Sequence, residues 1–492
     1  MLVDALLATQ RRQTSAEAVR DPSGSMTFGE LTALAAALRG LILENTQRDT
    51  VGLLLPGSGA FNAALFGTMW AGKTAVPLNF LLSADELAAI ARDAGFDAVF
   101  SIRAFEKLTA SLPARTFFVE ELDLEGEVAA FARKPFPPAP ETSADSVAVL
   151  PYTSGTTGAC KGVELTARGL KANANVLIQQ AELGDGDRFL SVIPPFHVLG
   201  LTGNVIVPTV RGLATLMVPR FSPAAVLAAI ESFRPTMIIA IPSMFAAILR
   251  QKSAARDAFA GVRMLISGGE PLPETVATAF RARFGRELHE GYGLTETSPV
   301  VSLNTPSAFR AGSVGRVVPG VEVRIAGPNN ESVPVGGDGE IMVRGLSVMR
   351  GYHNRPQETA AVLSADGWFR TGDIGAFDGE GFLRITGRKK EMMIVGGENV
   401  FPREIETVLE RHEQVAEAAV IGVADGSRGE VAVAFVILNA PGSATENDLR
   451  SFARERLAGY KVPRQVKILE DFPRGPTGKV QKRELRGLLS DG

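Results

Sequence analysis

A short stretch rich in hydroxyl groups and glycine, residues 152–162 with the sequence YTSGTTGACKG, has the clearest chemistry in this chain. Hydroxyls, unhindered backbone amides and one ammonium group are the donors that a polyphosphate needs at close range. The apolar run at residues 147–150 predicts a buried strand that ends at this loop, and nucleotides bind at such strand ends in α/β proteins. The stretch therefore predicts a phosphate-binding loop. Its candidate residues are Thr153, Ser154, Gly155, Thr156, Thr157, Gly158 and Lys161.

The spacing of this loop excludes the P-loop of kinases and GTPases. That motif has four residues between two glycines, and then Gly-Lys followed by Ser or Thr. Here two residues separate Gly155 from Gly158, and Lys161 is followed by Gly162. Clusters of Ser, Thr and Gly are also common in ordinary solvated loops, so one such stretch does not establish a nucleotide site.

A second stretch suited to phosphate lies near the end of the chain, at residues 473–485 with the sequence PRGPTGKVQKREL. Its prolines and glycines predict a stiff turn that presents one lysine, Lys479. A surface turn in a basic tail is the simpler interpretation of the same residues. Both stretches belong to one nucleotide site only if the fold brings Lys479 to the loop at residues 152–162.

Six ordered motifs resemble those of the acyl-adenylate-forming superfamily, which includes acyl-CoA synthetases, adenylation domains of nonribosomal peptide synthetases, and luciferases. The resemblance covers nearly the whole chain and is closest to acyl-CoA synthetases. It departs at Cys160, where the family usually has proline, so we expect a slightly looser loop with function retained. The motifs are YTSGTTGACKG, PPFHVLG (194–200), SGGEPL (267–272), GYGLTET (291–297), GWFRTGDIG through GRKKEMMIVGGENVFPREIE (367–406), and PTGK (476–479).

Composition bounds the class of protein. The chain has 492 residues, of which 45% are hydrophobic, enough for a large core and two or more domains. The net charge of −3 argues against a nucleic-acid partner, and a single cysteine excludes a disulfide framework. Arg11 and Arg12 interrupt any N-terminal signal, and no apolar segment is long enough to span a bilayer. We therefore expect a cytoplasmic protein, and leave open whether it is a monomer or a dimer.

Helix and strand patterns alternate along most of the chain, which predicts an α/β fold with doubly wound sheets. Residues 26–43, for example, predict a helix capped by Thr27. Short strands at residues 312–382 predict a small β-rich subdomain. The family resemblance places a hinge two positions after Arg388, at Lys390. We accordingly expect an N-terminal AMP-binding (adenylation) domain at residues 1–388 and a mobile α/β lid domain at residues 389–492, whose closure delivers Lys479.

The resemblance implies that a carboxylic acid attacks the α-phosphorus of ATP and releases pyrophosphate. Because two anions must meet, positioned cations and donors are the main catalytic requirement. Lys479 would lie between the acid and the α-phosphate. Glu296 would bind Mg²⁺, a hard cation that prefers oxygen ligands, with Thr295 and Thr156 as neighbours of the metal and phosphate.

The remaining nucleotide contacts are implied in the same way. Tyr292 offers a ring for one face of adenine, and the backbone of Gly269 and Glu270 lines the other. Asp373 is suited to accept hydrogen bonds from ribose hydroxyls, while Arg388 would donate to the ribose or a phosphate. Each of these residues also has an ordinary structural interpretation.

Two further sites follow from the resemblance. His197 borders the acid pocket and helps to position the carboxylate, although a histidine beside aromatic residues is usually only packed. Gly396 and Gly397 would wall a narrow tunnel for the pantetheine arm of CoA, the thiol that accepts the acyl group; a simple turn is the alternative. The predicted small molecules are the acid, ATP, Mg²⁺ and CoA.

The residues near the expected acid pocket indicate the kind of acid. Amino-acid-activating relatives have an aspartate shortly after the aromatic-His motif, and residues 198–208 and 233–242 contain none. Small and aliphatic residues in the pocket segments favour a medium- or long-chain fatty acid, with aryl acids as the alternative. An acyl carrier protein is an alternative acceptor; the basic residues that would bind it are Lys461, Arg464, Lys467 and Arg474.

Two other functions fit the sequence less well than a ligase does. A nucleotide-binding pseudoenzyme would lack pyrophosphate release, but Lys479, Glu296 and the hydroxyl-rich loop are all present. A serine hydrolase is excluded because the sequence has no GxSxG motif.

Cys160 lies in the predicted phosphate loop, so its thiol could make the protein sensitive to oxidation or alkylation. The simpler interpretation is that a small residue fills a tight loop.

Overall fold

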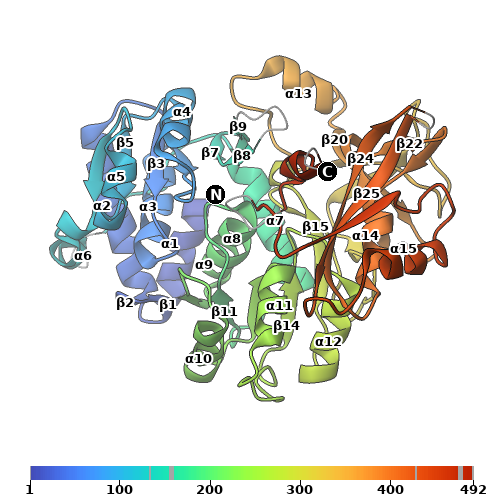
Figure 1. Cartoon of the computed structure of the whole chain (residues 1–492). Coiled ribbons are helices and arrows are strands. Elements are labelled where there is room, and N and C mark those ends of the chain that lie inside the picture. Colours follow the sequence, from blue (N-terminus) through green and yellow to red (C-terminus); the bar gives the residue numbers. More distant parts are fainter. Residues whose placement is uncertain (1, 132–134, 155–159, 427–428, 475–479, 490–492) are drawn as a thin grey trace.

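The computed structural model describes residues 2–131, 135–154, 160–426, 429–474 and 480–489 (Figure 1). The first half contains a six-stranded sheet in the order β10-β7-β4-β3-β5-β6, parallel except at the β10–β7 edge. Strand β3 is buried along its whole length, as expected for a parallel sheet covered on both faces. The strands are β3 (Thr50–Leu54), β4 (Thr74–Pro77), β5 (Ala98–Ser101), β6 (Arg115–Phe118), β7 (Val147–Val149) and β10 (Leu165–Thr166).

A nine-stranded sheet forms the centre of the molecule, in the order β17-β16-β15-β14-β13-β11-β12-β1-β2. Its strands are parallel from β15 to β1 and antiparallel at both ends. They are β1 (Glu17–Asp21), β2 (Gly24–Thr27), β11 (Arg188–Ser191), β12 (Ala214–Met217), β13 (Met237–Ala240), β14 (Met264–Ser267), β15 (His289–Gly293), β16 (Val300–Leu303) and β17 (Arg316–Val317).

Helices join the two sheets into one hydrophobic core. Helix α2 packs on α3, and α1 packs on α2 and α9. Helix α2 begins after Thr27, which forms a capping box with Glu30, so the predicted cap is confirmed. The helices of this part are α1 (Leu2–Gln13), α2 (Phe28–Asn45), α3 (Gly59–Trp70), α4 (Ala84–Ala94), α5 (Glu106–Thr109), α6 (Leu124–Phe131), α7 (Ala167–Gln180), α8 (Val198–Gly200), α9 (Val207–Arg211), α10 (Pro223–Phe233), α11 (Pro242–Arg250), α12 (Glu274–Phe284) and α13 (Pro356–Val362).

A four-stranded antiparallel sheet follows, in the order β18-β19-β20-β21. It comprises β18 (Val321–Ala326), β19 (Gly339–Gly345), β20 (Phe369–Phe377) and β21 (Leu383–Arg388). This is the β-rich region that the sequence predicts at residues 312–382, and the observed sheet continues to Arg388. Within this sheet, Asp373 in the middle of β20 pairs with Arg388 at the end of β21.

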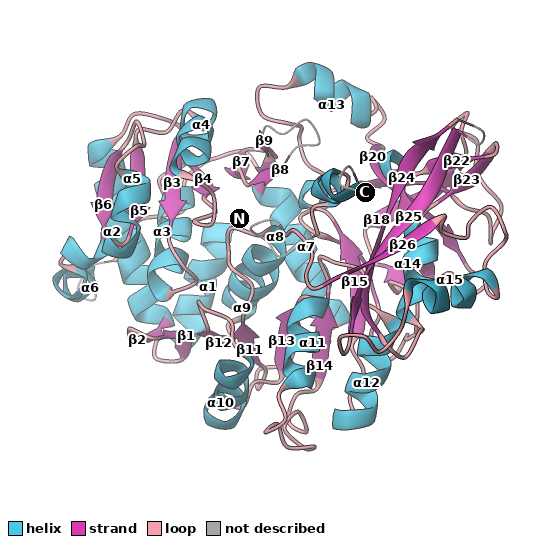
Figure 2. Ribbon diagram, viewed as in Figure 1, coloured by secondary structure: helices cyan, strands magenta, loops and turns pink. Residues whose placement is uncertain are grey.

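The C-terminal part has its own sheet and its own hydrophobic core (Figure 2). Its sheet has the order β23-β22-β25-β24, with β26 on β25, and α14 packs on β24. Its elements are β22 (Met393–Val395), β23 (Glu398–Val400), α14 (Pro402–Glu410), β24 (Val415–Asp425), β25 (Gly429–Leu438), α15 (Glu446–Arg454), β26 (Gln465–Leu469) and α16 (Lys482–Leu485). The predicted α/β fold, with a large N-terminal part and a smaller C-terminal part, is confirmed; the boundary at residue 388 stays a prediction.

In the described part of the chain, none of the helices is both long enough and apolar enough to cross a bilayer.

Candidate active site

A cleft of about 2580 Å³ lies between the central sheet and the C-terminal part. Its walls include the loops at the carboxyl ends of the parallel strands β13 and β14, which is where open α/β sheets bind ligands. Most of the described candidate residues line it. They are Thr153, Lys161, His197, Gly269, Glu270, Tyr292, Thr295, Glu296, Asp373, Arg388 and Lys390.

Some predicted residues are not placed at the cleft. Lys479 and residues 155–158, which include Gly155, Thr156, Thr157 and Gly158, lie outside the described residues. Ser154 is described only as the last residue of β8 (Tyr152–Ser154), which pairs with β9 (Cys160–Gly162). Their predicted roles stay predictions.

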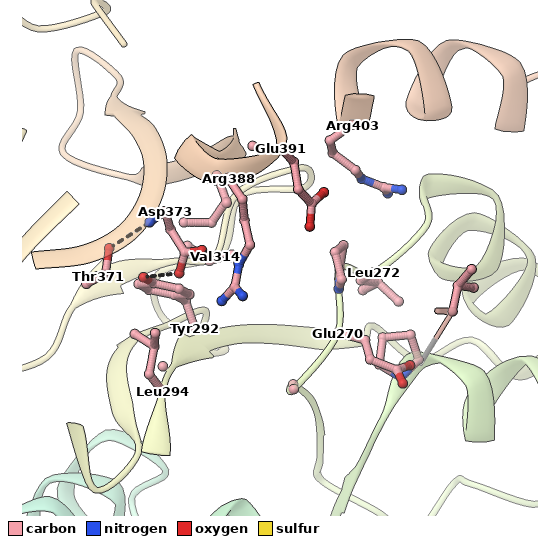
Figure 3. A pocket seen from close by; sticks show the side chains of 18 of the residues that line it. Glu270, Leu272, Tyr292, Leu294, Val314, Thr371, Asp373, Arg388, Glu391 and Arg403 are labelled. Atoms are coloured by element: carbon pink, nitrogen blue, oxygen red, sulfur yellow. Dashed lines mark hydrogen bonds and ion pairs between the residues drawn. The ribbon is translucent and has the colours of Figure 1, made fainter. Parts of the chain in front are cut away.

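Asp373 is the centre of a small polar network (Figure 3). The antiparallel register of β20 and β21 places it opposite Arg388, whose Nε donates to Asp373 Oδ1 at 2.6 Å. The Tyr292 hydroxyl donates to the other carboxylate oxygen at 2.7 Å. Burial, and then the charge of Asp373, raises the pKa of Tyr292 well above its ordinary value, so this hydroxyl remains a donor. Two motifs far apart in sequence, at residues 291–297 and 367–406, therefore meet at one carboxylate.

Glu296, the predicted metal ligand, lies in a short 3₁₀ helix, Thr295–Thr297, that follows β15. Its Oε1 accepts a hydrogen bond of 2.8 Å from the hydroxyl of Tyr352. Among the described residues, no group of three or more His, Cys, Asp or Glu side chains could hold a metal ion. A single carboxylate fits Mg²⁺, because this ion usually keeps water ligands and takes others from substrate phosphates.

Lys161 is held near Glu296 by residues that the sequence analysis missed. Its Nζ forms an ion pair with Glu358 and lies 5.3 Å from the ring centroid of Tyr352. A signal was available, because the chain has only four tyrosines. Three of them, Tyr152, Tyr292 and Tyr352, line the cleft.

His197 is held in the wall of the cleft. It precedes α8, and its Nδ1 accepts a hydrogen bond from the backbone N–H of Leu199 at 3.3 Å. When the ring is neutral, its proton is therefore on Nε2. Gly269 has a φ of +85°, which favours glycine, and a Cβ built there would lie 3.9 Å from Cε1 of His197. The glycine backbone and the imidazole thus share one wall.

Gly396 and Gly397 lie elsewhere. They form the tip of the β22–β23 hairpin with φ values of +62° and +90°. Apart from their chain neighbours, no atom of the described residues lies within 4 Å of a Cβ built at either. They do not line the cleft in this arrangement, so their role in binding pantetheine stays a prediction. Lys390, the predicted hinge, lies in the 3₁₀ helix Lys389–Glu391 between β21 and β22, and burial and the nearby Arg388 lower its pKa.

Charged side chains attach the C-terminal part to the rest of the molecule. Arg411 Nη2 lies 3.0 Å from Glu274 Oε2 on α12. Lys389 Nζ lies 3.1 Å from Glu340 Oε2 on β19. Within the C-terminal part, Lys482 Nζ contacts Glu391 at 3.0 Å and Glu406 at 2.7 Å. Burial alone would lower the pKa of Lys482, but these carboxylates outweigh burial and raise it. The lysine nearest in sequence to Lys479 among the described residues is thus engaged in ion pairs.

The basic residues considered for an acyl carrier protein all have partners within the C-terminal part. Lys461 pairs with Glu404, Arg464 with Asp425, and Arg474 with Glu417, while Lys467 donates to the backbone of Leu488. Surface pairs of this kind contribute little to stability, but they reduce the charge offered to a partner.

The sequence matches two family descriptions: AMP-binding enzyme over residues 6–353, and AMP-binding enzyme C-terminal domain over residues 404–479. A feruloyl-CoA synthase of Amycolatopsis is 37% identical over 483 residues, 97% of this chain and 96% of the relative. A long-chain-fatty-acid–CoA ligase of Salmonella typhimurium is 34% identical, over 94% of this chain and 90% of the relative.

Solved structures agree with this assignment. MatB from Rhodopseudomonas palustris is 28% identical, with coverage of 100% of this chain and 99% of MatB; its ATP-bound form gives a TM-score of 0.91 and its apo form 0.83. The o-succinylbenzoate CoA synthetase of Bacillus subtilis with ATP and magnesium is 29% identical, covers 98% and 99%, and gives 0.85. The chain belongs to the AMP-binding enzyme family. The predicted superfamily and the predicted enzyme class, an AMP-forming acid–thiol ligase, are confirmed.

Proposed function

We propose that this chain joins an apolar carboxylic acid to CoA in two steps, using ATP and Mg²⁺, and that a medium- or long-chain fatty acid is its substrate. One observation carries the proposal: the cleft collects Lys161, Glu296, Tyr292, Asp373 and His197 from four separate motifs. The ATP and ATP–magnesium complexes of the relatives, and the CoA-ligase activity in the names of others, support the same set of small molecules.

In the first step the acid carboxylate forms a bond to the α-phosphorus, and the bond to pyrophosphate breaks. Lys161 would neutralise the departing phosphates, while Asp373 would accept hydrogen bonds from the ribose and hold Arg388 beside it. Mg²⁺ on Glu296 would supply further positive charge. Lys479 would approach the α-phosphate from the C-terminal part.

In the second step the CoA thiol attacks the acyl carbon, and AMP leaves. For this step we propose that residues 389–492 rotate about Lys390 and bring Gly396 and Gly397 to the cleft. Two observations support a movable unit: the separate hydrophobic core of the C-terminal part, and a better superposition on the ATP-bound form of MatB than on its apo form.

The inner wall of the cleft favours an acid with an apolar body. Six aliphatic side chains of the lining are each less than a tenth exposed. A second charge on the acid would be buried there without a partner, at a cost of several kcal/mol. These residues are Val198, Leu199, Ile239, Ile266, Val300 and Leu303.

An aryl acid is the second candidate, because the feruloyl-CoA synthase matches almost the whole chain at 37% identity. CoA is the favoured acceptor over an acyl carrier protein, since the basic residues of the C-terminal part are paired within it.

The test is pyrophosphate release with Mg-ATP across straight-chain, aryl, dicarboxylic and amino acids, each with and without CoA. We expect sustained turnover with fatty acids only when CoA is present. Asp373→Ala, purified in parallel, controls for contaminating activity. Preference for an aryl acid would select the second candidate, and release with amino or dicarboxylic acids alone would contradict the apolar pocket.

A further inference from the structure

The phosphate side of the cleft contains a tyrosine that no sequence motif assigned. We propose that Tyr352 is a positioning residue: it orients the Glu296 carboxylate toward the Mg²⁺ of the nucleotide and keeps Lys161 beside it. This inference rests on the proposed function, because it needs Mg-ATP to bind here.

The hydrogen bond from Tyr352 to Glu296 fixes the carboxylate. The hydroxyl donates to Oε1 at 2.8 Å, so rotation of the carboxylate would break this bond. Oε2 is then the oxygen that Glu296 can offer to a cation. An additional bond holds the backbone, since the N–H of Met349 donates to the carbonyl of Glu296 at 2.8 Å.

Tyr352 is itself held by the strand that carries Lys161. It forms an antiparallel bridge with Val163, and the next residue, His353, donates its N–H to the carbonyl of Gly162 at 2.9 Å. The N–H of Tyr352 donates to the Thr359 hydroxyl at 2.9 Å. The backbone of residues 349–353 therefore connects β9 to the short helix of Glu296.

The ring of Tyr352 provides the second contact. Lys161 Nζ lies 5.3 Å from its centroid, within the range of a cation–π interaction, and Glu358 pairs with the same ammonium. One side chain thus contacts both the phosphate lysine and the metal carboxylate. The hydroxyl and the ring make different contacts, so a variant can remove the hydroxyl and keep the ring.

The decisive variant is Tyr352→Phe, which keeps the ring over Lys161 and removes only the hydroxyl. Mn²⁺ binding is measured by electron paramagnetic resonance with a non-hydrolysable ATP analogue and no acid present. We expect Mn²⁺ affinity to fall about tenfold, the factor for a lost hydrogen bond to a charged group. The Mg²⁺ concentration for half-maximal pyrophosphate release should rise to a similar extent, with the KM for the acid unchanged.

Tyr460→Phe is the control. Tyr460 is the tyrosine that does not line the cleft, and it is 37% exposed. Mn²⁺ affinity should be unchanged in this variant, and an equal fall in both variants would overturn the proposal, as would an unchanged affinity in Tyr352→Phe.

A double variant tests whether the tyrosine acts through Glu296. Once Glu296→Gln has removed the charged ligand, Tyr352→Phe should have no further effect on Mn²⁺ binding; full additivity would overturn the proposal. The binding measurement needs no acid turnover, so failure of the proposed ligase activity would be a separate result.

Discussion

Two pairs of adjacent glycines differ in how closely other atoms surround them. Gly268 and Gly269 follow β14 and have neighbours from Leu199, Ile241 and His197 between 3.4 and 3.9 Å from a built Cβ. Gly396 and Gly397 form the tip of the β22–β23 hairpin, with no neighbour within 4 Å. The first pair is already part of the cleft wall. The second pair can reach the cleft only if the C-terminal part moves, which separates the residues of the two half-reactions.

Under the proposed function, one arrangement of the chain would not serve both steps. Tyr292, Asp373 and Arg388, proposed for adenylate formation, are already joined by hydrogen bonds. Gly396 and Gly397, proposed for the thiol step, do not line the cleft. Substitutions in the two regions should therefore have different effects on the two half-reactions.

The largest effect is expected for Lys479→Ala. This variant should lose adenylate formation by a factor of about 10² to 10³, the range for removal of a donor to developing charge, and should retain thioester formation from supplied acyl-adenylate. The two half-reactions are measured separately, by pyrophosphate release and by CoA consumption. Lys107→Ala, an exposed lysine on α5, is the control. Equal loss of both half-reactions would contradict the separation of the two regions.

The reverse effect is expected for Gly397→Trp. A Cβ built at the hairpin tip has no neighbour within 4 Å among the described residues, so adenylate formation should be retained, while the thiol step should fall at least tenfold if the tip lines the pantetheine tunnel. Gly397→Ala is the matched control, because it brings the same strain at positive φ, about 1–2 kcal/mol, without the bulk. Comparable loss in the alanine variant would assign the effect to backbone strain instead of to the tunnel.

These two regions also show what could be predicted from the sequence. The ordered motifs predicted the superfamily and a common site for Tyr292, Asp373 and His197, while the alternation of helix and strand patterns predicted the α/β fold. The contact of Tyr352 with Glu296 could not be predicted, since it depends on how residues 349–359 cross β9. The position of Gly397 could not be predicted either, because sequence motifs do not specify the orientation of one rigid unit relative to another.

A smaller effect is expected for the buried carboxyl of Glu290, which is hydrogen-bonded to the turn that follows Gly268 and Gly269. Its Oε1 accepts a hydrogen bond of 3.0 Å from the N–H of Leu272, which fixes the turn after Gly269. Burial raises the pKa of Glu290 from 4.5 to about 7. Between these pH values the folded chain retains a proton that the unfolded chain loses. The contribution of Glu290 to the free energy of unfolding is therefore largest below about pH 4.5 and is lost as the pH rises through about 7.

Glu290→Gln should remove this contribution, because an amide oxygen can still accept from Leu272 but does not titrate. The pKa difference corresponds to about 3 kcal/mol, which is about 3 °C in melting temperature for a chain of this length. Melting temperatures of both proteins should be compared at pH 5 and pH 8. The wild type should lose about 3 °C relative to the variant between these values; parallel curves would show that Glu290 is ionised in the folded state.

The smallest effect is expected at Cys160, which lies on β9 beside the phosphate loop. Burial, and then the charge of Glu86, raises the pKa of the thiol, and the thiolate is the reactive form. Cys160→Ser should therefore keep activity within about twofold, and iodoacetamide at pH 7 should inactivate wild type and variant equally slowly. Cys160→Pro, which restores the usual family residue, tests whether the loop tolerates a stiffer backbone. Rapid inactivation of the wild type alone would instead show that alkylation of Cys160 abolishes activity.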